Sequence, residues 1–391
     1  MPHMHEPADI TIDAVALPDR SGVHRLTLRD GRVAAITPAP SAAPQWLALP
    51  GLANLHAHAD RSFTVDAFRP RSFADAMAAA AAARAAFTVD DVRARALRLF
   101  ERSIAHGVTR LRTHTDVDPL IELRSMEGVL AAKAEVAGRL DVDVIAFSTA
   151  RNELSEPEAL VRLEWAVALR PDFLGASLNG VRDPQAALGA LLDLAERTAL
   201  PVDLHLDEHL DPSRMLAPMV ADAVIARGLA GRVTFSHLCV LSVLDRTQAS
   251  ALTDKLARAG ITVLALPETN LLLQDRGEGA PRRRGITPLR ELIRAGVTVR
   301  LGTDNVRDAF YPFGDGDMLE TMLVAAVAAH LDDPAELIGA ACDGRRSVGE
   351  GDAADLVLVR AASFADALAR RPAERIVLKA GRQVAGPKLV V

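Results

Sequence analysis

The 391-residue chain has few cysteines, few aromatic residues and no long run of strongly apolar residues. Its two cysteines, Cys239 and Cys342, are too few for a disulfide framework and suit a reducing compartment. The most alanine-rich stretch, Ala76 to Ala86, is interrupted by Arg84 and is too weakly apolar to span a bilayer, so we expect a helix of a soluble protein there. Residues 1–7 lack the basic and apolar segments of a signal peptide. We therefore expect a cytoplasmic protein with no membrane partner.

The charge balance is also modest, because 45 Lys and Arg residues oppose 51 Asp and Glu residues and leave a formal charge of −6. An acidic chain gives no electrostatic reason to bind nucleic acid. The three consecutive arginines at 282–284 are not interleaved with aromatic residues, so we interpret them as loop or helix-start cations. Hydrophobic residues at 49% and charged residues at 25% are typical of a globular protein.

The middle of the chain alternates short apolar runs with stretches of helical spacing, such as Val92–His106, Pro184–Thr198 and Pro288–Ala295. Eight such alternations over roughly 300 residues predict an α/β fold, a (β/α)8 TIM-type barrel with its active site at the carboxyl ends of the strands. A doubly wound sheet is the alternative, but no glycine-rich phosphate loop follows the first run. The predicted strands are Leu52–His58, Val108–His114, Val142–Ser148, Phe173–Leu178, Val202–Leu206, Val233–Leu238, Thr262–Pro267 and Thr298–Asp304.

Both ends of the chain have the pattern of short strands rather than helices. Residues 10–36 alternate in short apolar runs, and Asp30-Gly31 supplies a hairpin turn, followed by a Pro/Ala linker at 37–44. Near the other end, Asp352–Val359 and Arg375–Gly381 also read as strands. We predict a small β-sandwich domain made from both termini. The expected boundaries are 1–50 for its N-terminal part, 51–346 for the barrel and 347–391 for its C-terminal part.

Histidines gather at the predicted strand ends. His56 and His58 lie two apart, so both side chains point to the same side of the first strand. Three more chemistry-bearing residues end later strands, namely His205, His237 and Asp304. In a closed barrel these strand ends meet at one mouth, where imidazoles and a carboxylate can hold zinc or ferrous iron. A hydrogen-bonded core histidine is the alternative for each residue taken singly, but the joint pattern favours a metal site.

Glu208 follows His205 by three residues, where the chain turns over the barrel mouth. Hydrolysis needs a group that takes a proton from a metal-bound water and delivers it to the substrate, and a partly desolvated carboxylate suits that task. A bound divalent cation lowers the pKa of such a water to roughly 7. The alternative for Glu208 is a solvated loop carboxylate.

Taken in order, these motifs resemble the cytosine deaminase branch of the amidohydrolase superfamily over about residues 50 to 350. The resemblance implies one divalent metal ion, Zn²⁺ or Fe²⁺, held by His56, His58, His205 and Asp304. It also implies that Glu208 is the proton shuttle, that His237 holds and polarises the hydroxide, and that Asp304 accepts a proton from the attacking water. The motifs that carry it are Pro50-Gly51, His56-Ala57-His58, Arg112-Thr113-His114-Thr115-Asp116-Val117, His205-Leu206-Asp207-Glu208, Ser236-His237, Arg283-Arg284-Gly285-Ile286-Thr287, Asp304-Asn305-Val306 and Gly351-Asp352-Ala353-Ala354-Asp355-Leu356-Val357.

Lysines are too few and wrongly placed for the two-metal version of this site. Relatives with two metals bridge them with a carboxylated lysine on the fourth strand, and the run Phe173–Leu178 contains no lysine. The implied reaction is therefore that of a mononuclear aminohydrolase. Hydroxide attacks a ring carbon that bears an exocyclic amine, Glu208 protonates the adjacent ring nitrogen, and ammonia leaves. The expected partner is a small N-heterocyclic substrate, and homo-oligomerisation stays open.

The match departs from cytosine deaminases at the residue that reads the substrate ring. Their glutamine at the end of strand three is replaced here by Thr149, whose hydroxyl cannot make the same paired contacts. Asn152 or Asn179 could supply the missing contacts, with loop-turn roles as the alternative. Phe310 or Tyr311 could stack on a flat ring or simply pack in the core. His114 at the end of strand two could support the site or only the core.

Two other functions stay open from the residues. The stretch Val306–Met318 resembles isopropylammelide amidohydrolases, which act on N-alkylamino triazines, although those enzymes lack a glutamate at the position of Glu208. Hydrolysis of a cyclic amide belongs to the same alternative. A catalytically silent binding protein is the third reading, and the complete set of ligand and proton-transfer residues argues against it.

Overall fold

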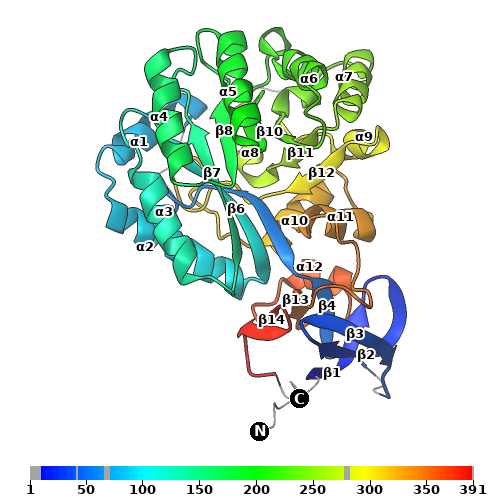
Figure 1. The fold of residues 1–391 in the computed structure, drawn as a ribbon. Coiled ribbons are helices and arrows are strands. Elements are labelled where there is room, and N and C mark those ends of the chain that lie inside the picture. The colour runs from blue at the N-terminus through cyan, green and yellow to red at the C-terminus, as the bar shows by residue number, and fades with distance from the viewer. Residues whose placement is uncertain (1–9, 41–42, 66–70, 277–281, 390–391) are drawn as a thin grey trace.

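The computed structural model describes residues 10–40, 43–65, 71–276 and 282–389. The predictions for residues 1–7 and for part of the 37–44 linker lie outside the described residues. Eight parallel strands form one sheet in the order β12-β11-β10-β9-β8-β7-β6-β5, with helices outside it (Figure 1). The strands are β5 Leu52–Ala57, β6 Val108–Val117, β7 Asp141–Ser148, β8 Phe173–Ser177, β9 Val202–Leu206, β10 Val233–His237, β11 Thr262–Ala265 and β12 Thr298–Leu301. The (β/α)8 prediction is confirmed.

The barrel closes where the chain leaves β12 and meets the end of β5. Ala57 and Asp304 form a parallel bridge, and the Asp304 N–H donates to the carbonyl of His56 at 2.9 Å. Gly302 permits this approach, because a Cβ at that position would lie 2.6 Å from the Cβ of His56. The last strand is therefore shorter than predicted, ending at Leu301, since its continuation becomes the closing loop that carries Asp304.

The helices that cover the barrel follow the periodicity of their sequences. In α2 the residues Val92, Ala96 and Leu99 recur at helical spacing and are completely buried. Helix α7 begins at a capping box formed by Asp245 and Gln248. The helices are α1 Phe73–Arg84, α2 Val89–Ala105, α3 Arg124–Glu135, α4 Pro157–Ala168, α5 Pro184–Thr198, α6 Ala217–Ala226, α7 Arg246–Arg258, α8 Pro267–Leu273, α9 Leu289–Arg294, α10 Met318–Ala328 and α11 Pro334–Ala341, with short 3-10 turns at Pro212–Arg214 and Cys239–Val243.

The terminal segments form a second sheet at one end of the barrel, with blue N-terminal strands beside red C-terminal strands (Figure 1). Its order is β15-β14-β13-β4-β1-β2-β3, and all pairs are antiparallel except β1 with β4. The predicted turn between β2 and β3 is present, with positive φ at Asp30 and Gly31. The strands are β1 Ile10–Leu17, β2 Arg20–Arg29, β3 Arg32–Pro38, β4 Trp46–Pro50, β13 Leu356–Val359, β14 Arg375–Lys379 and β15 Arg382–Ala385, with helix α12 at Phe364–Arg370. The exact domain boundaries stay predictions.

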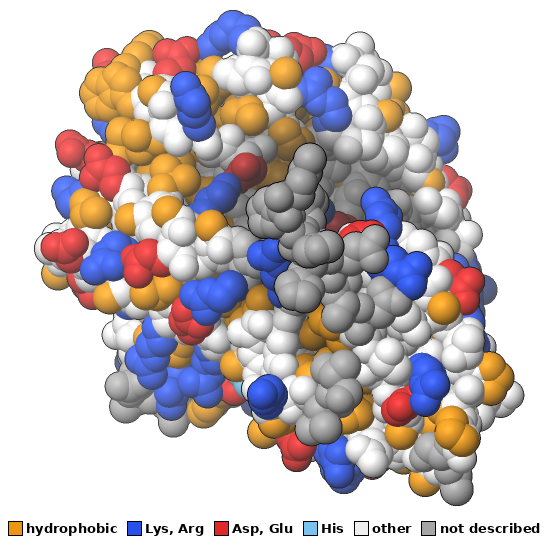
Figure 2. Space-filling model, turned by 60° about the horizontal axis from the view of Figure 1, so that its bottom comes forward, with side chains coloured by type: hydrophobic (Ala, Val, Ile, Leu, Met, Phe, Trp, Pro, Cys, Tyr) orange, Lys and Arg blue, Asp and Glu red, His pale blue; other side chains and the backbone are white. Residues whose placement is uncertain are grey.

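The surface matches the modest net charge. Figure 2 shows basic and acidic side chains mixed over one face of the molecule rather than gathered by sign. Among the described residues, no helix is both long enough and apolar enough to cross a membrane.

Candidate metal centre and active site

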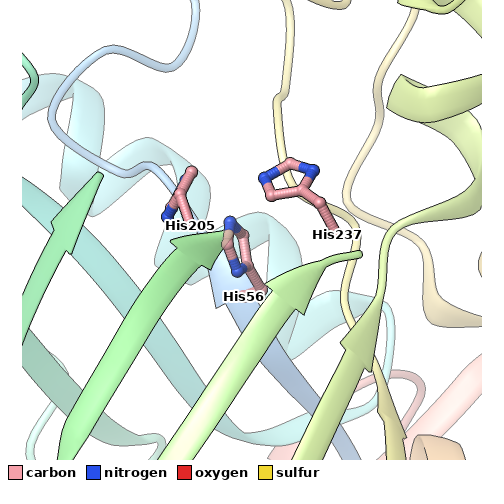
Figure 3. Close-up of side chains that lie close together, drawn as sticks. All are labelled: His56, His205 and His237. Carbon is pink, nitrogen blue, oxygen red and sulfur yellow. The ribbon is translucent and has the colours of Figure 1, made fainter. Parts of the chain in front are cut away.

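Four predicted ligand side chains meet at the carboxyl ends of the barrel strands. The Nε2 atoms of His58 and His205 lie 3.2 Å apart. Asp304 Oδ1 lies 3.3 Å from His58 Nε2 and 3.5 Å from His56 Nε2. Figure 3 shows the rings of His56, His205 and His237 gathered above the strand ends, with His205 at the tip of one strand and His237 at the tip of the next. Residues 56 and 304 are thus neighbours because the barrel closes between them.

The chemistry of these four groups fits a single divalent metal ion. Ligands at 2.0–2.1 Å around a tetrahedral ion are separated by about 3.3 Å, close to the distances found here. His56 Nε2 and both Asp304 carboxylate oxygens are buried without a hydrogen-bond partner. Burial lowers the pKa of His56 to about 4, so its imidazole is neutral, which is the form that binds metals. Three nitrogens and one oxygen suit zinc or ferrous iron.

His56 is oriented by a hydrogen-bond chain that sequence patterns did not reveal. The Ser236 hydroxyl donates to Asp203 Oδ1 at 2.8 Å, so its oxygen is free to accept from His56 Nδ1, 2.9 Å away. With its proton on Nδ1, His56 presents the lone pair of Nε2 to the centre. Burial works to raise the pKa of Asp203, but His114 and Arg112 outweigh it and lower the pKa to about 2. Asp203 is therefore an anion at neutral pH.

His114 lies against the centre, as one reading of the sequence predicted. Its ring centroid is 4.0 Å from that of His56, and its Nε2 is 3.3 Å from Asp203 Oδ1. The ring is completely buried. His114 therefore contacts both a predicted ligand and the carboxylate that orients it.

The backbone is strained where the strands end. Asp207, His237 and Asp304 all have φ between 53° and 75°, in the left-handed region that residues with a Cβ rarely occupy. Such strain persists where surrounding structure imposes it, and it is concentrated at functional sites. Asp207 directly follows β9, His237 is the last residue of β10, and Asp304 lies three residues beyond β12.

Glu208 and His237 face each other beside the predicted ligands. Glu208 Oε1 lies 3.5 Å from His237 Nδ1, and the carboxylate side chain is 13% exposed. Burial raises the pKa of Glu208 to about 7, although His237 opposes the rise. A carboxyl with this pKa exchanges protons readily near neutral pH. Asn270 Oδ1, from helix α8, also lies 3.2 Å from His237 Nδ1.

Glu208 is held by the predicted substrate residue Asn179. In the amide orientation that satisfies its neighbours, the Asn179 oxygen accepts from the N–H groups of Asp207 at 3.1 Å and Glu208 at 3.2 Å. Asn179 therefore fixes the turn that carries Glu208, while its side chain also lines the adjoining cavity.

A cavity with about 710 Å³ of empty space, part of it open to solvent, lies over the centre. All three predicted substrate residues line it, namely Thr149, Asn179 and Phe310. Thr149 has already used its hydroxyl proton, which it donates to Asp118 Oδ2 at 3.1 Å. Asn152 serves the fold instead, because its amide donates to Ser148 Oγ and the carbonyl of Ala159.

Two buried arginines in the cavity wall, Arg61 and Arg84, were missed by sequence reasoning. Arg61 donates to Asp308 at 3.2 Å and to Asn305 at 3.0 Å. The predicted alanine-rich helix, α1, ends at Arg84, whose Nε lies 2.6 Å from Asp116 Oδ2. The only sequence signal was an arginine that interrupts an apolar helix.

Comparison with known proteins agrees with the fold and the site. The pattern that defines the Amidohydrolase family matches residues 158–385. A pterin deaminase from Rhizobium rhizogenes is 31% identical, covering 96% of this chain and 91% of that protein. An N-isopropylammelide isopropyl amidohydrolase from Pseudomonas is 25% identical over 88% of this chain and 87% of its own length. The chain therefore belongs to the amidohydrolase family.

Solved structures place it more narrowly. The 5-methylcytosine deaminase from Klebsiella pneumoniae liganded with 5-fluorocytosine superposes with a TM-score of 0.88 at 25% identity, covering 98% of both chains. The N-isopropylammelide isopropylaminohydrolase from Burkholderia multivorans superposes with a TM-score of 0.81 at 27% identity, covering 97% of this chain and 98% of the other. The protein is a deaminase-like amidohydrolase, and thus a hydrolase that acts on C–N bonds.

Proposed function

We propose that this protein is a metal-dependent aminohydrolase that removes an exocyclic amine, as ammonia, from a small N-heterocycle. The similar pterin deaminase and 5-methylcytosine deaminase support this reaction class. The observation that carries the proposal is that Glu208, with a pKa raised to about 7, faces His237 beside the four converging ligand groups. That arrangement joins a site for a cation to a group that can move protons.

The metal would be held by His56, His58, His205 and Asp304, as one Zn²⁺ or Fe²⁺ ion. When bound, such a cation lowers the pKa of a coordinated water and supplies a nucleophile near neutral pH. Asp304 has a second carboxylate oxygen without a hydrogen-bond partner, which can accept a proton from that water. His237 presents an unpartnered Nε2 toward the same region and can orient the attacking oxygen.

Glu208 would carry the proton to the substrate. Protonating the ring nitrogen next to the amine-bearing carbon makes that carbon more electrophilic, and a second proton then converts the amine into a good leaving group. Both transfers act on charge that develops only in the transition state. The pKa of about 7 allows Glu208 to accept and release a proton without a large energy difference between the two forms.

A second candidate is release of an alkylamine from an N-alkylamino triazine. The similarity to two N-isopropylammelide enzymes supports it. A cyclic amide bound in the same cavity would contact the same proposed metal site and proton-transfer residues. A catalytically silent binding protein has less support, because the full set of ligand and proton-transfer side chains is present. We also propose a cytoplasmic location, which two buried free cysteines support.

The test combines metal analysis with a substrate panel. Purified protein should contain about one zinc or iron per chain by mass spectrometry. It should release ammonia from at least one of cytosine, 5-methylcytosine, pterin or creatinine, whereas isopropylamine release from N-isopropylammelide would favour the second candidate. Glu208→Gln should retain the metal but lower kcat by about 10²- to 10⁴-fold. The matched control is Glu291→Gln, at an exposed position of α9, which should change neither value.

A protein without a bound metal, or one that hydrolyses nothing in the panel when reconstituted with Zn²⁺ or Fe²⁺, would contradict the proposal. Full activity of Glu208→Gln would remove the proton-shuttle role while leaving the metal site intact.

A further inference from the structure

The residue that the sequence places at the ring-reading position is not free to read a ring. Thr149 donates its only hydroxyl proton to Asp118 Oδ2 at 3.1 Å, and its oxygen accepts from the Arg151 N–H at 3.3 Å. Asp118 is itself fixed, because its other oxygen accepts from the backbone N–H groups of Leu120 and Ile121. Recognition of the ring edge therefore has to come from another side chain of the cavity wall.

Arg84 offers what Thr149 lacks. Its side chain is 4% exposed and lines the same cavity as Glu208 and His237. Its Nε lies 2.6 Å from Asp116 Oδ2, and its Nη1 lies 3.6 Å from Asp118 Oδ2. Two buried carboxylates thus hold one side of the guanidinium in place. Within the described part of the chain neither Nη1 nor Nη2 makes a hydrogen bond, so both terminal nitrogens have N–H groups to offer a ligand.

The neighbouring Arg61 cannot play this part. It donates from Nε to Asp308 and from Nη2 to Asn305, and its Nη1 lies 3.8 Å from Asp116. Its guanidinium carbon also lies 4.7 Å from the centre of the Phe310 ring. Among the described residues, Arg61 therefore has only Nη1 without a hydrogen bond, which is too few nitrogens for a fork, and its guanidinium packs on the Phe310 ring.

We propose that Arg84 is the specificity-determining residue of this site and that it selects fused bicyclic substrates that present an oxo oxygen next to an unprotonated ring nitrogen. A guanidinium has donors and no acceptor, so it pairs with two adjacent acceptors and not with an edge that alternates donor and acceptor. The same pairing occurs where arginine reads the O6 and N7 atoms of guanine. This inference rests on the proposed aminohydrolase function.

The substrate class follows from the chemistry. A 2-amino-4-oxopteridine has its oxo group beside ring nitrogen N5, and its amine lies on the far side of the ring. The proposed orientation places the acceptor pair at Arg84 and the amine-bearing carbon at Glu208, two residues that line the same cavity. Cytosine has no second ring and cannot present such a pair in addition to its reacting edge.

The test compares pterin with 5-deazapterin, in which the acceptor nitrogen becomes a C–H group. For the metal-loaded wild type, kcat/KM should be about 10- to 100-fold lower for 5-deazapterin than for pterin, the range expected for one bidentate pair. Arg84→Lys keeps the charge but loses the planar fork. In that variant kcat/KM for the two substrates should differ by less than about 3-fold. The loss of activity on pterin relative to the wild type should appear mainly as a higher KM. Arg197→Lys, on the outer face of α5 and paired with Glu164, is the matched control and should behave as wild type.

A binding measurement covers the case in which Arg84→Lys does not fold. The deaminated ring 2,4-dioxopteridine should bind the wild type at least about 10-fold more tightly than its 5-deaza analogue by calorimetry, with and without metal. Equal affinity for the two rings, or an equal loss for both substrates in Arg84→Lys, would overturn the inference.

Two further outcomes separate the possibilities. One outcome is that kcat/KM is higher for 6-carboxypterin than for pterin, that this difference disappears in Arg84→Lys, and that 5-deazapterin and pterin have equal kcat/KM. In that case Arg84 binds a carboxylate substituent and the ring-edge assignment is wrong. If the metal-loaded wild type releases no amine from any heterocycle, the proposed function fails, whereas a preference for cytosine over pterin refutes only the assignment of Arg84.

Discussion

At the scale of single residues, the centre depends on side chains that never touch the predicted metal ion. Ser236 links His56 to the anionic Asp203, and this chain decides which imidazole nitrogen carries the proton. Groups in such positions orient ligands and strengthen their binding. We therefore expect the metal affinity to depend on residues of three different strands, β5, β9 and β10, in addition to the other proposed ligands.

Removing this link should weaken the metal site without unfolding the barrel. Ser236→Ala leaves His56 free to adopt the other tautomer, so affinity for Zn²⁺ should fall by about 10- to 100-fold. Competition with a fluorescent chelator measures the change. Ser250→Ala, at an exposed position of α7, is the control and should match the wild type. Unchanged affinity in Ser236→Ala would show that other contacts orient His56.

At the scale of elements, the short helix α8 connects the active site to the helical layer. It begins at Pro267, one residue after β11, and Asn270 at its middle contacts His237. Glu268 in its first turn is buried and accepts from Thr321 of α10 at 2.5 Å. Burial raises the pKa of Glu268 to about 8, although Thr321 opposes the rise. The helix therefore carries a carboxyl that is protonated at neutral pH.

The raised pKa makes stability depend on pH in a definite direction. Folding favours the protonated form of Glu268, so this stabilising effect is complete below the unfolded pKa of about 4.3 and is lost as pH rises to about 8. Between pH 5 and 8, the free energy of unfolding of the wild type should fall by about 1 kcal/mol per pH unit relative to Glu268→Gln. Urea titrations of the metal-free proteins measure this. Parallel curves for the two proteins would contradict the assignment.

At the scale of the whole molecule, a buried ion pair joins the terminal sheet to the barrel. Arg375 begins β14 and donates to both oxygens of Asp317, at 2.7 and 2.6 Å, and to the carbonyl of His106 at 2.7 Å. Asp317 also caps helix α10. The Arg375 side chain is 1% exposed, so the pair is shielded from water and salt.

Breaking this pair should destabilise the protein strongly. Asp317→Asn keeps a capping side chain but leaves the Arg375 charge buried without a counter-ion, so unfolding should become easier by about 3 kcal/mol at pH 7. Burial works to raise the pKa of Asp317, but Arg375 outweighs it and lowers the pKa. The pair therefore stabilises above about pH 4, and its contribution is lost as pH falls through the folded-state pKa.

The matched control is Asp366→Asn, which breaks an exposed pair with Arg370 in α12 and should change stability little. Chemical denaturation at pH 7 compares the two variants. Equal effects would mean that Arg375 is stabilised by its carbonyl contacts alone.

The sequence by itself determined the strand and helix order, because hydrophobic periodicity depends on neighbouring residues. It also predicted which histidines and carboxylates would lie at or near the strand ends, although Asp304 lies three residues beyond β12. The convergence of His56, His58, His205 and Asp304 was predictable in this way, although their mutual distances were not.

The tertiary structure decided the remainder, because hydrogen-bond partners and burial arise between segments that are far apart in the chain. Asp203 and Ser236 look like ordinary strand residues until β9, β10 and β5 pair. Arg84 ends an alanine-rich helix, and only the packing of that helix against the barrel mouth places its guanidinium in the cavity wall. Likewise, the sequence places Thr149 at the position expected to recognise the substrate ring. Its hydrogen bond to Asp118, however, depends on the neighbouring strand β6.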